Sequence, residues 1–251
     1  MYHSITFGEK NTWDDWRLVS PVLPSFAPPT QKTTYLDIPG ASGVIDLSEM
    51  LTGYPIFNNR EGSFEFLRLN GYESWQDIYS AIADYLHGRA MRCYLEDDRN
   101  WFYEGRFFIK DWKNTTPWTT VTIGYNVGPY KWSVRKTCDD WLWDPFNFQN
   151  GVITAAFFKN IRITSGGAWT RKTFPPELVG SAPVCPSFAI QGTGSAGMDI
   201  RFVNPTVHID ATRHLRDGIH QIPDFLFVGG RETLYFKGNG TVSIDFHQGR
   251  L

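Results

Sequence analysis

The alternation of apolar and polar residues along the chain predicts a mainly β protein. Residues 118–127, WTTVTIGYNV, show the pattern clearly, because Val121, Ile123 and Tyr125 fall on one face of a strand and Thr120 and Thr122 on the other. Strands with one apolar face are typical of antiparallel sheets, whose second face meets solvent. Related patterns predict further strands over residues 3–8, 11–19, 32–38, 90–97, 100–112 and 130–136.

Residues 74–88, SWQDIYSAIADYLHG, follow a helical period instead. Ser74 fits the N-cap position, and Gly88 fits the position just after the helix end. Three apolar residues spaced four apart form one stripe: Ile78, Ile82 and Leu86. The pattern predicts a helix that covers one face of a sheet.

The proline-rich stretch from Ser20 to Gln31 interrupts the strand pattern. Proline has no amide hydrogen to donate to a β-ladder, so it is rare in central strands. We expect an extended connector that lies against another part of the protein and is not a central strand.

The character of the chain changes after Thr137, which predicts domains at residues 1–137 and 138–251. The stretch that follows is aromatic, acidic and rich in turn residues, and we interpret it as the junction, with Trp141 and Trp143 packed inside it. Beyond it, short strand patterns recur at turn spacing without a helical period. They predict a β-sandwich or jelly roll for the second domain.

Composition narrows the classes of function. The formal net charge is −2 without a run of lysine or arginine, which argues against a nucleic-acid partner. No apolar run reaches the roughly 18 residues that a membrane helix needs, so we expect no membrane insertion. The polar N-terminus and the three cysteines, Cys93, Cys138 and Cys185, indicate a product with reduced thiols, made in a cytoplasm.

Motifs that carry chemistry are weak in this chain. GTGSAG, residues 192–197, matches the dinucleotide fingerprint, but strand patterns flank it on both sides, so we interpret it as a hairpin turn. The spacing of six between His208, His214 and His220 is wider than zinc sites usually have, although Asp210 shares a strand face with His208. We therefore expect no metal site and no cofactor.

Adjacent carboxylates occur as pairs at Asp14/Asp15, Asp97/Asp98 and Asp139/Asp140. A glycosidase needs two carboxyl groups that face each other across a groove, whereas neighbours on a strand point to opposite faces. Turns and helix caps are the better interpretation of these pairs. We expect no catalytic residues and no enzyme.

Four blocks carry a resemblance to a known family: ITFGEKNTWDDWRL (5–18), YLDIPGASGVIDLSEMLTGYP (35–55), NREGSFEF (59–66) and GNGTVSIDFHQGRL (238–251). In this order they resemble the distal tail proteins (Dit) of long-tailed phages and prophages of Gram-positive bacteria. The resemblance runs from the first strand to the last residues, and the N-terminal half carries most of it.

The resemblance implies a structural protein of the phage tail tip that forms a hexameric ring. The N-terminal domain is then a tail-tube-like β-sandwich flanked by one helix, and the C-terminal domain is a galectin-like β-sandwich. The ring joins the major tail tube protein on one side and the tail-associated hub protein on the other. The C-terminal domain docks receptor-binding proteins in some baseplates, and the family offers no catalytic residues.

The glycine-punctuated stretch IPGASGVIDLSEMLTGYP, residues 38–55, has the composition of an arm that grips a neighbouring subunit. Its apolar anchors are Ile38, Val44, Ile45, Leu47 and Leu51. Arg60 and Glu61 follow as candidates for pairing across subunits, and the alternative is an ordinary surface pair worth less than about 1 kcal/mol. Assignment of the oligomer interface to these residues is a hypothesis based on composition.

An alternative function stays open at this point. Aromatic residues make up 16% of the chain, and exposed aromatic rings on the second domain are also suited to stacking on a host-surface saccharide. In that case the protein is a carbohydrate-binding β-sandwich module.

Overall fold

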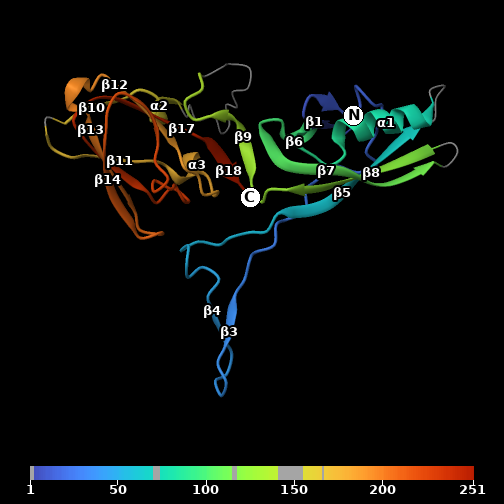
Figure 1. The fold of residues 1–251 in the computed structure, drawn as a ribbon, viewed down its shortest axis with the longest axis horizontal. Coiled ribbons are helices and arrows are strands. Elements are labelled where there is room, and N and C mark those ends of the chain that lie inside the picture. The colour runs from blue at the N-terminus through green and yellow to red at the C-terminus, as the bar shows by residue number, and fades with distance from the viewer. Residues whose placement is uncertain (1–2, 70–73, 115–117, 141–154, 166) are drawn as a thin grey trace. The chain divides into compact units, whose positions relative to one another are not determined.

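The computed structural model describes residues 3–69, 74–114, 118–140, 155–165 and 167–251 (Figure 1). The chain divides into two compact units. The first contains Met1–Ser48, Pro55–Val134 and Leu251, and the second contains Glu49–Tyr54 and Arg135–Arg250. Strands dominate both units, which confirms the mainly β fold class. The domain boundary after Thr137 stays a prediction about independently folding parts.

The sheet of the first unit is antiparallel and centred on β7 (Trp101–Asn114), which pairs with β6 (Arg89–Leu95) and β8 (Trp118–Val127). On one side β6 pairs with β1 (Ile5–Phe7), which pairs with β2 (Lys10–Asn11). On the other side β8 pairs with β5 (Arg60–Leu69). The start of β7 also pairs with β9 (Lys131–Lys136), and a short 3-10 helix, η1 (Glu96–Asp98), follows β6.

Alternation along β8 places one face in the core, as the sequence predicts. Val121, Ile123 and Tyr125 are all buried, and they pack with Phe66 and Phe107 of the neighbouring strands. The expectation of a half-buried strand is therefore confirmed.

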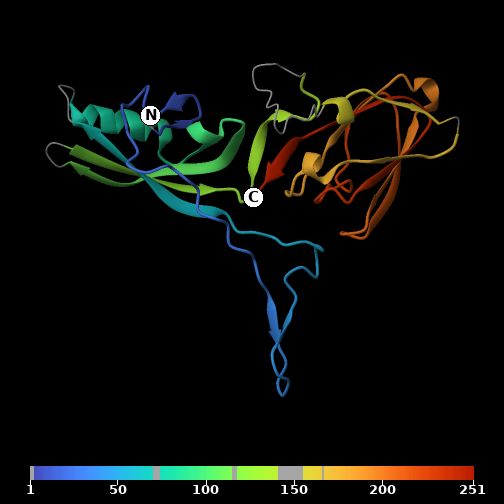
Figure 2. The same ribbon diagram turned by 180° about the vertical axis from the view of Figure 1, so that it is seen from behind.

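The predicted helix is α1 (Trp75–Leu86), and it covers one face of this sheet (Figure 2). Ile82 and Leu86 are buried and Ile78 packs against the same core, so the apolar stripe is confirmed. Ser74 occupies the N-cap position but its side chain makes no capping hydrogen bond. Gly88 follows the C-cap at a φ of 75°, a left-handed conformation that glycine adopts without strain.

The strand predicted over residues 11–19 is wrong, because a local turn competes with the sheet. The Asn11 side-chain oxygen accepts hydrogen bonds from the amides of Trp13 at 2.9 Å and Asp14 at 3.2 Å, which is an Asx turn. The Asp15 carboxylate accepts from the amide of Asn11 at 2.8 Å and fixes the same turn from the other end. Only Asn11 itself lies in a strand.

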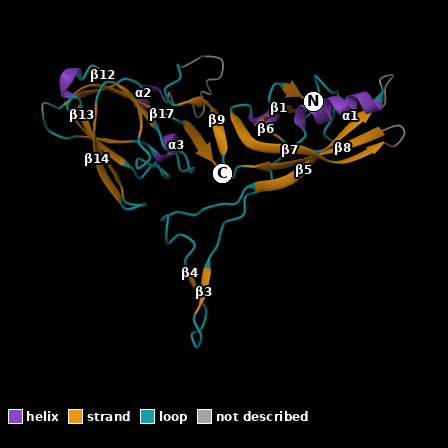
Figure 3. Ribbon diagram, viewed as in Figure 1, coloured by secondary structure: helices purple, strands orange, loops and turns teal. Residues whose placement is uncertain are grey.

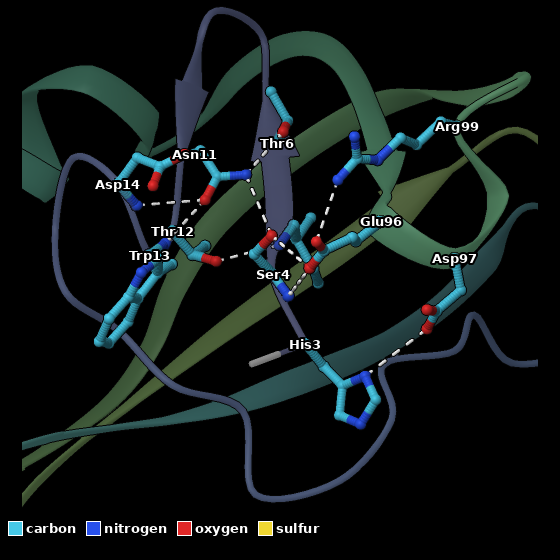
Figure 4. A network of polar contacts seen from close by, with 11 residues as sticks. His3, Ser4, Thr6, Asn11, Thr12, Trp13, Asp14, Glu96, Asp97 and Arg99 are labelled. Atoms are coloured by element: carbon cyan, nitrogen blue, oxygen red, sulfur yellow. Dashed lines mark hydrogen bonds and ion pairs between the residues drawn. The ribbon is translucent and has the colours of Figure 1, made fainter. Parts of the chain in front are cut away.

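A polar network fastens this N-terminal turn to the end of β6 (Figure 4). The Glu96 carboxylate accepts from the Ser4 amide at 3.1 Å and from the Ser4 hydroxyl at 2.8 Å. These two hydrogen bonds, together with one from Arg99, lower the pKa of Glu96. The Asn11 side-chain amide donates to the hydroxyls of Ser4 and Thr6, so the network joins three short segments.

The proline-rich connector is extended and lies outside the regular strands, as predicted, and Gln31 at its end forms an isolated bridge with Phe57. Val19 exchanges two backbone hydrogen bonds with Leu67 at 2.7 and 2.8 Å, just before the connector begins. Phe26 is buried among the rings of Phe64, Tyr103 and Tyr125, with centroid distances between 4.0 and 5.1 Å.

The second unit contains two antiparallel four-stranded sheets (Figure 3). One sheet has the order β10 (Ile161–Thr164), β17 (Asn239–Asp245), β12 (Ser187–Gln191) and β15 (Gly218–Gln221). The other has the order β11 (Thr170–Thr173), β16 (Thr233–Lys237), β13 (Met198–Asn204) and β14 (Ile209–Leu215). The remaining elements are α2 (Ala155–Phe158), α3 (Pro176–Val179), η2 (Gly194–Ala196) and β18 (His247–Arg250).

The inward residues of both sheets form one apolar core, which makes this unit a β-sandwich. Ile190 and Ile244 come from one sheet, and Phe202 and Phe236 come from the other. The Phe202 ring stacks on Phe227 with a centroid distance of 5.8 Å and an interplanar angle of 5°. The closer likeness to a galectin stays a prediction.

The GTGSAG segment is not a hairpin turn, because β12 and β13 belong to different sheets. The segment carries the chain across the sandwich through η2, between two strands. Asp217, on the other crossing turn, accepts from the amides of Gly192 at 3.1 Å and Thr193 at 3.0 Å. Hydrogen bonds from Thr193 lower the pKa of Asp217 and tie the two crossings together.

Trp141, Trp143 and the rest of the predicted junction over residues 141–154 lie outside the described residues. No helix in the described part of the chain is both long and apolar enough to cross a membrane.

Candidate functional site

Between the connector and β5, residues 30–58 form a hairpin that we call the arm (Figure 1), of which Glu49–Tyr54 are grouped with the second unit. Two short antiparallel strands run along it: β3 (Tyr35–Asp37) and β4 (Val44–Asp46). Every residue of both strands is exposed. The arm is therefore a ladder without a core of its own.

Hydrogen bonds hold the two legs together at the base of the arm. The amide of Lys32 donates to the carbonyl of Ile56 at 2.8 Å, and the amide of Asn58 donates to the carbonyl of Thr30 at 2.8 Å. The Asn58 side chain adds a bond to the Thr30 hydroxyl at 3.0 Å. Because both legs are paired, the arm leaves the unit as a defined hairpin.

A second set of hydrogen bonds joins the two legs next to β3 and β4, on the side that faces the base of the arm. The amide of Leu47 donates to the carbonyl of Thr34 at 2.9 Å, and the amide of Thr34 donates to the Ser48 hydroxyl at 2.9 Å. The Asp46 carboxylate accepts from the Ser48 amide at 2.9 Å. Donation from the hydroxyl and amide of Ser48 lowers the pKa of Asp46.

Glycines make the tip of the arm possible. Gly40 and Gly43 have φ values of 87° and 83°, which side chains other than glycine rarely adopt. A Cβ atom at either position would meet nothing within 4 Å. Backbone conformation, and not close approach, therefore requires glycine here.

The register gives the arm two chemically different faces. Leu36 lies opposite Ile45, so these two apolar side chains share one face. The other face combines Tyr35 opposite Asp46 and Asp37 opposite Val44. One face is apolar and the other mixes apolar and acidic groups.

Solvent reaches most of the predicted anchors. Val44 is 59% exposed and Leu51, on the returning leg, is 98% exposed, while Leu47 is half-buried. Ile38 and Ile45 are also exposed. Because an isolated two-stranded hairpin is at best marginally stable in water, the exposed apolar residues make the arm a candidate contact surface.

Sequence reasoning missed three exposed side chains of the arm: Tyr35, Leu36 and Met50. The signal for the first two was present, since residues 32–38 were expected to form a strand. Their membership of the arm was missed because the predicted arm began only at Ile38, after this strand.

Arg60 and Glu61 separate in the structure. Glu61 is exposed on β5 and accepts from the Asn126 side chain at 2.7 Å. Arg60 is buried, so its guanidinium is inaccessible to a neighbouring subunit. The burial is at odds with the expected pairing across subunits, and we leave Arg60 out of the proposed interface.

Two of the predicted histidines of the second unit, His214 and His220, have local partners. The ring Nδ1 of His214 lies 2.6 Å from the Asp199 carboxylate, and Nε2 of His220 lies 2.8 Å from the Arg216 carbonyl. Asp210 pairs with Arg201 through two hydrogen bonds of 2.6 and 2.7 Å, whereas His208 lies before β14 at a φ of 53°. The described residues contain no cluster of three or more potential metal ligands.

The paired carboxylates lie in turns and a 3-10 helix. Asp14 and Asp15 belong to the N-terminal turn, and Asp97 and Asp98 belong to η1. Asp140 pairs with Lys159, whose proximity lowers the pKa of the aspartate. All three cysteines are free thiols, and burial raises the pKa of each.

Comparison with known proteins gives a match at the level of structure. No protein-family model and no curated protein matches the sequence. The fold is similar to the crystal structure of SPP1 Dit (gp 19.1), described as a paradigm of the hub adsorption apparatus in phages that infect Gram-positive bacteria. The match covers 100% of both chains with a TM-score of 0.64 and 12% identity. The whole chain therefore has the fold of a distal tail protein, as the sequence motifs predict.

Proposed function

We propose that this chain is a structural protein of a phage tail tip whose copies join through the arm into a hexameric ring. The observation that carries the proposal is the solvent-exposed apolar pair Leu36 and Ile45 on a paired hairpin. Burial of such side chains against a second copy removes apolar area from water, at about 25 cal/mol per Å².

A ring needs one patch that binds a different patch on the next copy, and repetition of that contact closes the ring. A projecting hairpin suits the role because it reaches beyond its own unit. The predicted anchors Ile38, Val44, Leu47 and Leu51 belong to the same arm, and Met50 joins them at 75% exposure. Glu61 lies at its base on β5.

In this proposal the ring joins the major tail tube protein to the tail-associated hub protein. The second unit docks receptor-binding proteins, and the protein works at the virion tail tip after synthesis in the bacterial cytoplasm. Similarity of fold to SPP1 Dit along the whole chain supports this place in a tail. In this proposal the protein has a structural role and performs no catalysis.

The test compares the purified chain with Leu36→Asp/Ile45→Asp by light scattering and negative-stain imaging over a series of concentrations. Rings are expected for the unchanged protein. The double variant is expected to stay monomeric and folded, because a buried aspartate without a partner costs several kcal/mol.

Ile219→Asp is the matched control, because Ile219 is an aliphatic residue at 79% exposure in the second unit. It is expected to form rings like the unchanged chain. Rings from the arm variant, or monomers from the unchanged chain at every concentration, would contradict the proposal.

Saccharide binding by the second unit is a second candidate function. The outward face of the sheet that contains β11 carries Tyr235 opposite both Arg171 and Arg201, and Arg201 also forms a bidentate pair with Asp210. Trp169, at 43% exposure, precedes β11. Aromatic rings beside fixed hydrogen-bonding groups favour sugars. A glycan array with Trp169→Ala and Tyr235→Ala as comparisons tests this function.

A further inference from the structure

A buried cation stands where the arm returns to its unit. Arg60 begins β5, and only 6% of the residue is exposed. Its Nε donates to the carbonyl of Pro129 at 2.8 Å, and its Nη1 donates to the carbonyl of Ala27 at 3.0 Å. The guanidinium also lies over the ring of Tyr103, 5.5 Å from the centroid. One side chain thus joins the strand after the arm to the connector before it.

Both backbone polar groups of Ala27, the amide and the carbonyl, form hydrogen bonds with side chains. Its carbonyl accepts from Arg60, and its amide donates to the Tyr125 hydroxyl at 2.9 Å. The preceding residue, Phe26, is buried in an aromatic cluster. The connector is therefore fixed at Ala27, directly before the chain enters the outgoing leg of the arm.

Burial of the Arg60 guanidinium is costly in free energy if its only role is to stabilise the fold. No carboxylate of the described residues pairs with the guanidinium, and burial lowers the pKa of Arg60. Replacement of buried charged groups by apolar side chains of similar size is often neutral or stabilising in proteins. A buried cation bound to two backbone carbonyls is better explained by the geometry that it imposes.

We propose that Arg60 is a positioning residue, which fixes the direction of the arm by tying the connector at Ala27, before the outgoing leg, to the start of β5, after the returning leg. The inference rests on the proposed function, because that direction matters only if the arm binds a second copy. A preoriented arm loses less conformational freedom on binding than a free one, so the ring forms at lower concentration.

Lysine is the informative replacement. It keeps the positive charge, but its ammonium is a compact point charge and lacks the planar fork that reaches two carbonyls in fixed directions. Arg60→Lys therefore tests geometry separately from charge. Tyr125→Phe removes the hydroxyl that accepts from Ala27 and keeps the buried ring, so it tests the same link from the second side.

The experiment is hydrogen exchange of backbone amides, measured together with ring assembly. In Arg60→Lys, the amides of Lys32 and Asn58 at the base of the arm are expected to exchange roughly tenfold faster, because local opening becomes easier. The amides of Val19 and Leu67, which bond to each other's carbonyls away from the arm, are expected to be unchanged. Tyr125→Phe is expected to act in the same direction.

Assembly provides the second readout. The concentration at which half of the chains are in rings is expected to rise about tenfold in Arg60→Lys. Arg68→Lys, a change of the same chemistry on the same face of β5, is the control and is expected to leave both readouts unaffected. If Arg60→Lys fails to fold, Tyr125→Phe carries the test.

A uniform rise in exchange across the first unit would overturn the inference, since it indicates a purely structural role. Unchanged exchange at the base of the arm, or faster exchange with unaltered assembly, would overturn it as well. Failure of the proposed function looks different: Leu36→Asp/Ile45→Asp then leaves the oligomeric state unchanged, whatever Arg60→Lys does.

Discussion

Leu36 lies directly opposite Ile45 across the two strands of the arm, and both side chains face solvent. Val44, although adjacent to Ile45 in sequence, lies on the other face opposite Asp37. We therefore expect Ile45→Asp to weaken ring assembly by roughly a hundredfold and Val44→Asp to weaken it less. Sedimentation velocity over a concentration series measures both.

The comparison of the two single variants separates a face-specific contact from simple removal of apolar area. Val44 is more exposed than Ile45, at 59% against 45%. If exposed area alone decided the result, Val44→Asp would have the larger effect. That ranking would argue against a contact through the face of Leu36 and Ile45.

The sequence predicts those parts of the fold where local pattern and tertiary packing agree. Residues 118–127 alternate and form β8, and residues 75–86 carry an apolar stripe and form α1. Residues 38–55 were interpreted as an arm from their glycines and apolar residues, and they lie within the hairpin of residues 30–58, whereas their role in an oligomer interface stays a prediction.

Predictions failed where a side chain competes with the backbone pattern or where distant segments meet. The Asn11 side chain accepts hydrogen bonds from two following amides and forms an Asx turn where a strand was predicted. GTGSAG resembles a hairpin because the sheet membership of β12 and β13 depends on pairing with distant strands. Burial of Arg60 depends on Ala27 and Pro129, which no local pattern connects to it.

Gly8 is expected to resist replacement, because its backbone conformation and its contact with Tyr85 both favour glycine. Its φ is 61°, and a Cβ atom would lie 2.6 Å from the Tyr85 hydroxyl, which donates to the Phe7 carbonyl at 2.9 Å. Gly8→Ala should destabilise the protein by about 2 kcal/mol or more, because left-handed backbone strain adds to the loss of this contact.

Gly128→Ala is the control for Gly8, because a Cβ atom at Gly128 would meet only the Glu104 carbonyl at 3.7 Å, an ordinary contact. Urea unfolding followed by circular dichroism measures both variants. Equal free energies of unfolding for the two would refute the role assigned to Tyr85.

Glu232 should make stability depend on pH in an unusual direction. The residue is buried, which raises the pKa of its carboxyl above the ordinary range, although the Val228 amide donates to it. The favourable protonated form is fully present below the ordinary pKa and is lost as the pH rises through the raised one. Glu232→Gln should therefore match the unchanged protein near pH 4 and exceed its stability near pH 8.

Glu177→Gln removes the same charge from an exposed position of the second unit and serves as the control. Its stability relative to the unchanged protein is expected to vary little over the same range. Thermal unfolding at a series of pH values measures both variants. A Glu232→Gln variant that loses stability as the pH rises would show that the ionised carboxylate is favoured in the fold.

The substitution Phe202→Ala tests whether the two parts of the chain fold independently, as the predicted boundary after Thr137 requires. The residue is fully buried in the second unit, where its ring stacks on Phe225 and Phe227. Phe202→Ala should cost about 3–5 kcal/mol and lower the melting temperature of that unit by about 10 °C or more.

Phe66→Ala, which removes a fully buried ring from the first unit, should shift the other transition instead. Differential scanning calorimetry resolves the two cases, because a single transition that moves in both variants would mean that the chain unfolds as one cooperative unit.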